Sequence, residues 1–246
     1  MSQYIYSSSF GQGILDMKPL QKQHPLTNIK DPGSALTHFI GFMCAVFLTP
    51  VLLIHASKNN ASFESLIAFS VFMLSSTLLY AASTAYHTFM LKTDAGNRRL
   101  RKLDHCMIPV LIAGSYTPIC VVALGEGIGT MLLRGIWILA FLAVIFKLFW
   151  IGCPKWVSSA MYLILGWFCV LALPGIFRSL RLPAFFLLLS GGLIYSAGAI
   201  IYALNVPLFN SRHPHFGSHE IFHLFVMGGN LCHFIVVYVF LAGAMN

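Results

Sequence analysis

Three histidines in the sequence have positions that suit the binding of one metal ion. His219 and His223 lie four residues apart. Residues with this spacing share one face of a helix, with Cβ atoms about 5 to 6 Å apart. Two imidazoles one turn apart, joined by a third from a neighbouring helix, match the nitrogen sites that suit Zn²⁺. His87 is the third candidate, and we predict a zinc site formed by His87, His219 and His223.

A zinc ion with three protein ligands is catalytic in type, because its fourth position holds water. The metal lowers the pKa of that water toward about 7. Asp104 is the carboxylate expected to hold this water and to act as general base, with orientation of a metal ligand as its alternative role. Ser83 precedes His87 by one helical turn, and we expect it to hydrogen-bond Asp104 or a polarised carbonyl. The catalytic candidates are therefore Asp104 and Ser83.

The composition describes a membrane protein. Of the 246 residues, 58% are apolar and 9% are charged, whereas soluble domains carry about 25% charged residues. A membrane-spanning helix needs roughly 20 mainly apolar residues. The chain has seven such stretches: Ala35 to Ala56, Phe63 to His87, Cys106 to Leu124, Met131 to Ile151, Ser158 to Phe177, Ala184 to Leu204 and Ile221 to Ala244. We predict an all-α bundle of seven transmembrane helices in the cell membrane.

The basic residues indicate the orientation of this bundle. Eleven Lys and Arg residues lie on the side of the N-terminus, and four lie on the other side. Because basic residues in short loops stay in the cytoplasm, the N-terminus is predicted inside and the C-terminus outside. Residues 1–34 are predicted to form a cytoplasmic tail and residues 35–246 the membrane domain. The net charge of +8 is thus explained by topology, and no nucleic acid is expected as a partner.

This topology brings the candidate site together. His87 ends the second span, Asp104 opens the third, and the pair of His219 and His223 opens the seventh. All four residues are then predicted at the cytoplasmic side, where an ionisable group needs a partner or a function because its insertion costs about 2.5 to 3.5 kcal/mol. Each has a structural alternative: such histidines snorkel or cap helix ends, an isolated serine bonds its own helix backbone, and Asp104 can pair with Arg101 or Lys102.

The string HEIFH also matches the HExxH pattern of zinc proteases, in which Glu220 would be the general base. The match is short in a chain with ten histidines, and no third protease ligand follows it. Glu220 is alternatively expected to face the cytoplasmic mouth or to offset the positive loops. His38, His105 and His233 are left out of the ligand set, and His233 is predicted to hydrogen-bond between helices.

Several motifs together resemble the progestin and adipoQ receptor superfamily, and within it the bacterial hemolysin III group. They are THFIG at Thr37 to Gly41, SxxxH at Ser83 to His87, LDH at Leu103 to His105, GSYTP at Gly114 to Pro118, and SHEIFH at Ser218 to His223 with His233. The resemblance implies a seven-helix bundle with a cytoplasmic N-terminus. It also implies zinc held by His87, His219 and His223, and a water held by Asp104.

The resemblance implies two conflicting activities. The wider superfamily includes lipid amide hydrolases such as ceramidases, whereas hemolysin III members are named for cell lysis. Our leading hypothesis is a zinc-dependent hydrolase of lipid amide or ester bonds. The alternatives are a membrane-perturbing protein with structural zinc, an intramembrane protease and, with no inverted repeat in its favour, a transporter. Membrane lipids are the expected partners, no protein partner is evident, and a receptor role is least favoured because the outer loops are small.

Overall fold

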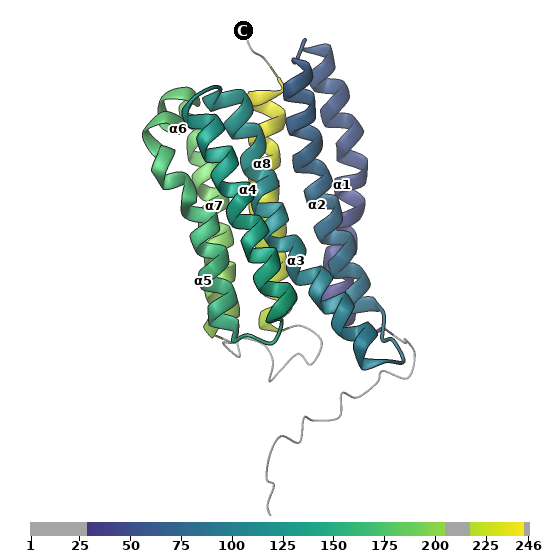
Figure 1. The fold of residues 1–246 in the computed structure, drawn as a ribbon. Helices are drawn as coiled ribbons and strands as arrows, with labels where there is room; N and C mark the ends of the chain where they lie inside the picture. The colour runs from purple at the N-terminus through teal and green to yellow at the C-terminus, as the bar shows by residue number, and fades with distance from the viewer. Residues whose placement is uncertain (1–28, 205–216, 244–246) are drawn as a thin grey trace, which may run out of the picture.

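The structure is a computed structural model, and it describes residues 29–204 and 217–243. Within these ranges the chain is helical and forms no strand (Figure 1). The helices are α1 (Pro32–Lys58), α2 (Phe63–Thr88), α3 (Asp94–Pro118), α4 (Ile128–Phe149), α5 (Lys155–Gly166), α6 (Leu173–Ser179), α7 (Leu182–Leu204) and α8 (Ser218–Ile235). The π-helical segments η1 (Ile119–Leu124) and η3 (Val236–Leu241) extend α3 and α8, and a 3₁₀ segment, η2 (Trp167–Ala172), joins α5 to α6.

These elements form seven spans that are long and apolar enough to cross a membrane. Four are single helices, and the others are α3 with η1, α5 to α6 through η2, and α8 with η3. The spans run side by side as one bundle (Figure 1). The predicted all-α, seven-span architecture is confirmed. The orientation of this bundle in the membrane stays a prediction.

The largest difference from the predicted boundaries is at the third span. Its helix begins at Asp94, whereas the apolar stretch begins at Cys106. The polar start is stabilised by Thr93, whose hydroxyl accepts a hydrogen bond from the Gly96 amide at 3.2 Å. Helix ends depend on such caps and not on hydropathy. The resulting span of 31 residues is roughly 45 Å long, so its first turns project beyond a hydrocarbon core of about 30 Å.

The fifth span changes its helical form at η2, where the regular backbone ladder is interrupted. Tyr116 of α3 supplies hydrogen bonds to this irregular segment. Its hydroxyl donates toward the carbonyls of Leu165 and Gly166, at 3.1 and 2.5 Å, and accepts from the Cys169 amide at 2.9 Å. Irregular backbone at membrane depth needs such partners, because the lipid offers none.

Small residues allow the helices that carry the predicted site to approach closely. A Cβ atom on Gly114 of α3 would lie 2.0 Å from the Ser75 hydroxyl oxygen of α2. A Cβ atom on Gly229 of α8 would lie 2.7 Å from the Tyr195 ring of α7. These glycines therefore help set the positions of α2, α3, α7 and α8.

Lys147, counted among the basic residues of the cytoplasmic side, is only 1% exposed. Its ammonium group donates to the Ser158 hydroxyl at 2.5 Å and to the Cys153 sulfur at 3.2 Å. The α4–α5 connection thus folds over the end of α4 and covers this lysine. The sequence did not indicate this burial, because the covering residues follow Lys147 only after the helix has ended.

Candidate metal centre

His87, His219 and His223 come together at one end of the bundle. His87 lies in the last turn of α2, and the other two lie in the first turns of α8. One ring nitrogen of each lies within 4.8 Å of the other two. The Nε2 atoms of His87 and His219 are 3.2 Å apart, and two nitrogens bound to one tetrahedral Zn²⁺ would be about 3.3 Å apart. The three residues thus form a cluster of nitrogen donors at a spacing compatible with one metal ion; zinc as that ion stays a prediction.

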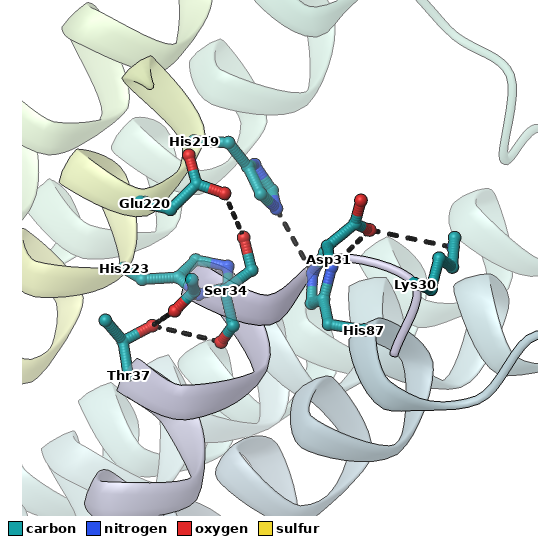
Figure 2. Close-up of polar contacts among 9 residues, drawn as sticks. Lys30, Asp31, Ser34, Thr37, His87, His219, Glu220 and His223 are labelled. Carbon is teal, nitrogen blue, oxygen red and sulfur yellow. Dashed lines mark hydrogen bonds and ion pairs between the residues drawn. The ribbon is translucent and has the colours of Figure 1, made fainter. Parts of the chain in front are cut away.

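Asp31, which sequence reasoning missed, adds a carboxylate behind His87 (Figure 2). Its Oδ2 atom lies 3.0 Å from His87 Nδ1, and its backbone amide donates to the His87 carbonyl at 2.9 Å. The neighbouring Lys30 amide donates to the Thr88 carbonyl at 3.3 Å. Metal-binding histidines commonly donate their other ring N–H to a carboxylate, which fixes the ring and its tautomer. Asp31 therefore directs His87 Nε2 toward the other two histidines.

The environment of Asp31 keeps its carboxylate charged. Burial raises the pKa of Asp31, but its hydrogen bond and electrostatic interaction with His87 and its attraction to Lys30 outweigh this effect. The net pKa lies below its ordinary value. Lys30 Nζ is 4.0 Å from Asp31 Oδ2. An ionised Asp31 is the form that accepts a hydrogen bond from the N–H group at His87 Nδ1.

Thr37 of α1 has the corresponding contact with His223. Its hydroxyl oxygen lies 3.3 Å from His223 Nδ1 and 3.0 Å from the Ser34 carbonyl oxygen. Because the one hydroxyl hydrogen goes to a backbone carbonyl, Thr37 accepts a hydrogen bond from His223 Nδ1, and Nε2 stays free to bind a metal. His38 packs flat against the same ring, with centroids 3.7 Å apart and an interplanar angle of 8°.

Glu220 caps the start of α8. One carboxylate oxygen accepts from the Ser34 hydroxyl at 2.6 Å (Figure 2). The other accepts from the Gly217 amide at 2.7 Å. A carboxylate that bonds the backbone amide before a helix stabilises the helix end. These contacts favour a role of Glu220 in capping α8 over a role as protease base.

Asp104 and Ser83 lie beside the histidines in the wall of one cavity. Asp104 is 7% exposed and Ser83 is 1% exposed. The Ser83 hydroxyl has no hydrogen-bond partner among the described residues, although it faces the Asp104 carboxyl. Buried polar groups normally have partners. This orphaned hydroxyl next to three histidines and a carboxylate fits a site that holds a polar ligand.

The cavity connects the metal centre to the apolar interior. It has a volume of about 170 Å³ and an almost wholly apolar lining. At the polar end its wall includes His38, Asp104 and His219, and deeper in the bundle it includes Leu79, Leu111 and Ile176. The shape and lining suit a hydrocarbon chain with one polar group.

His105 and His233 lie apart from the ligand cluster. Within residues 29–204 and 217–243, that cluster contains His87, His219 and His223. The Nδ1 atoms of both His105 and His233 are buried without a hydrogen-bond partner in this part of the chain. His233 interacts with the backbone of Leu188 on α7, as expected for an interhelical contact.

The supporting residues left a signal in the sequence. Asp31, Ser34 and Thr37 are three residues apart and precede or begin the first apolar stretch. This spacing places polar groups along one side of a helix start. The predicted tail of residues 1–34 includes Asp31 and Ser34, whereas α1 already begins at Pro32. Proline is common in the first turn of a helix, so the helix start was recognisable.

Comparison with known proteins assigns the family. The family described as "Haemolysin-III related" matches residues 26–234. "Hemolysin-3" of Bacillus cereus is 36% identical over 205 residues, which cover 83% of this chain and 89% of that protein. The chain belongs to the haemolysin III-related family. The "Hemolysin-3 homolog" of Bacillus subtilis (strain 168) is 33% identical over 83% of this chain and 91% of its own length.

A more distant similarity connects this haemolysin III-related chain to eukaryotic receptors. The "Adiponectin receptor protein" of Drosophila melanogaster is 27% identical over 228 residues, covering 83% of this chain and 49% of that protein. The resemblance stated from the motifs is confirmed. With its seven apolar spans, the chain is a multi-pass membrane protein, consistent with the bacterial cell membrane.

Proposed function

We propose that this protein is a zinc-dependent hydrolase that cleaves amide or ester bonds of lipids at the cytoplasmic side of the membrane. The observation that carries the proposal is the position of the three-histidine cluster. It lies beside a buried carboxylate at the polar end of an apolar cavity. A soluble substrate would not need that cavity, and a purely structural metal would not need the carboxylate.

His87, His219 and His223 would hold the metal, with Asp31 and Thr37 keeping two of the rings in the required tautomer. When bound, Zn²⁺ supplies a Lewis acid for the carbonyl oxygen and an activated water. The remaining steps would be carried out by side chains of the protein.

Asp104 would accept a proton from the attacking water and return it to the leaving amine nitrogen or alcohol oxygen. Its burial suits a group that must exchange a proton without losing it to bulk solvent. The Ser83 hydroxyl would donate a hydrogen bond to Asp104 or to the carbonyl oxygen as charge develops there. The cavity would hold the acyl chain and orient the bond to be cleaved.

The test is release of fatty acid from native membrane lipids by purified, zinc-loaded protein. Asp104→Asn should lower the rate roughly 10²-fold or more, because general base catalysis typically contributes that much. His87→Ala should abolish zinc binding and hydrolysis together. An unchanged product yield from both variants, or no product from the wild type with any native lipid, would exclude the enzymatic proposal.

The second candidate is a membrane-perturbing protein in which zinc only ties α2 to α8. The name "Hemolysin-3" of the Bacillus cereus relative favours it, and so does a cluster that joins helices distant in the sequence. Dye leakage from liposomes separates the two functions. Leakage that is lost in His223→Ala and kept in Asp104→Asn would indicate structural zinc. Loss in both variants would indicate chemistry.

A further inference from the structure

We propose that Arg101 and Lys155 form an anion subsite at the mouth of the metal centre, which binds the phosphate of an anionic glycerophospholipid. The inference rests on the proposed function and narrows its substrate class. It concerns two basic side chains that come from different spans and are not part of the ligand cluster.

Arg101 lies on the projecting turns of α3, one turn before Asp104. Its side chain is exposed, and it makes no ion pair within 4.0 Å with any residue that the structure describes. It interacts electrostatically with Asp104, His105 and Tyr202, all of which line the cavity. Arg101 thus lies on an exposed part of α3, one helical turn before Asp104 in the cavity wall.

Lys155, the first residue of α5, lies at the same mouth. Its ammonium nitrogen is 4.9 Å from the centroid of the Tyr202 ring, and that ring lies 5.7 Å from the His219 ring. One aromatic side chain thus separates Lys155 from a metal ligand. Lys155 also interacts electrostatically with Arg101. A phosphate within reach of both cations would interact favourably with each of them.

The acidic groups nearby have other roles. Asp31 contacts His87 and Lys30, and Glu220 accepts hydrogen bonds from Ser34 and Gly217. Asp104 is buried one turn deeper than Arg101. Among the residues that the structure describes, Arg101 and Lys155 thus place two basic side chains at the mouth, which suits an anionic ligand.

A glycerophospholipid matches the order of groups from the mouth inward. Its phosphate would lie at Arg101 and Lys155, its ester carbonyls at the histidines and Asp104, and its acyl chain in the apolar cavity. Arginine binds phosphate through two parallel N–H groups, and lysine adds a compact charge. Within the proposed function, this order of groups favours hydrolysis of ester bonds over amide bonds. It also favours a headgroup with a net negative charge, in which no cationic group neutralises the phosphate.

The experiment measures lipid binding to the full-length, zinc-loaded protein in nanodiscs or detergent. The probes are phosphatidylglycerol, zwitterionic phosphatidylcholine and inorganic phosphate. The test variant is Arg101→Gln with Lys155→Gln. The control, Lys92→Gln with Arg98→Gln, removes the same charge from exposed residues of the α2–α3 connection and the second turn of α3. Unfolding temperatures are compared to establish that both variants fold.

We expect the wild type to prefer phosphatidylglycerol over phosphatidylcholine, and the test variant to lose roughly tenfold or more of that preference. The control should lose much less. An equal loss in both variants would show a general attraction to anionic surfaces and would overturn the subsite. Inorganic phosphate binding as tightly as the lipid would overturn the assignment to a lipid headgroup.

The failure of this inference is distinguishable from failure of the proposed function. If the lipid preference persists in His87→Ala but no lipid is hydrolysed by any form, the subsite stands and the hydrolase does not. If Arg101→Gln with Lys155→Gln hydrolyses phosphatidylglycerol with an unchanged KM, the hydrolase stands and the subsite does not.

Discussion

Asp31 is the residue whose place in the structure differs most from the place expected from the sequence. It precedes the first span, yet its carboxylate contacts a histidine that is 56 positions later. Metal affinity commonly depends on such outer partners nearly as much as on the ligands themselves. The centre is therefore a three-element site, in which α1 orients rings carried by α2 and α8.

We predict that Asp31→Asn lowers zinc affinity about 10- to 100-fold, because an amide holds the His87 ring less firmly and no longer favours the required tautomer. Competition with a fluorescent chelator measures this change. Asp94→Asn is the matched control, since Asp94 is exposed at the start of α3. Equal affinity in wild type and Asp31→Asn would show that the carboxylate does not support the ligand.

Glu220 permits a second single-residue prediction. In Glu220→Gln the amide oxygen can still accept one of the two hydrogen bonds that the carboxylate now accepts. We expect folding and lipid hydrolysis to be retained within a few-fold. Rates of product release and unfolding temperatures are the measurements. If hydrolysis fell as far as in His87→Ala while folding was unchanged, Glu220 would belong to the chemistry.

The position of α8 depends on its contact with α7. Tyr195 lies against Gly229, where a Cβ atom would be 2.7 Å from the ring. Since His219 and His223 are on α8, a displacement of this helix would also displace two of the three clustered histidines. Packing of the helices and geometry of the metal centre are in this way linked.

Gly229→Ala should therefore destabilise the protein by about 1 to 3 kcal/mol, the usual cost of overpacking, and lower its zinc content. Gly192→Ala on α7 is the matched control, because a Cβ atom there would meet no atom within 4 Å. Thermal unfolding in detergent and elemental analysis measure the two effects. Identical behaviour of both variants would mean that the α7–α8 contact adapts without cost.

Zinc should also stabilise the bundle as a unit, because its ligands join the second span to the seventh. A ligand that binds only the folded state adds about 4 kcal/mol at 1,000 times its dissociation constant. We expect chelation to lower the unfolding temperature of the wild type, and zinc to restore it. The His87→Ala variant should not respond to either treatment. A wild type that unfolds at the same temperature with and without chelator would argue against zinc as the joining ion.

Much of the architecture was predictable from the sequence. The seven spans follow from apolar length, since a bilayer imposes the same local requirement on every crossing helix. The grouping of His87, His219 and His223 followed from helical spacing together with the odd number of spans. Both properties depend on short stretches of chain and on the number of spans that separate them. The structure brings the three histidines together.

The contacts around those histidines were not predictable in the same way. The pairing of Asp31 with His87, the capping of α8 by Glu220 and the burial of Lys147 each depend on how one helix or connection lies against another. Helix rotation and packing angle result from side chains along the full length of the bundle. A local pattern therefore indicated the three histidines that the structure brings together, whereas the groups that hold, orient and enclose them became evident only when the helices were packed together.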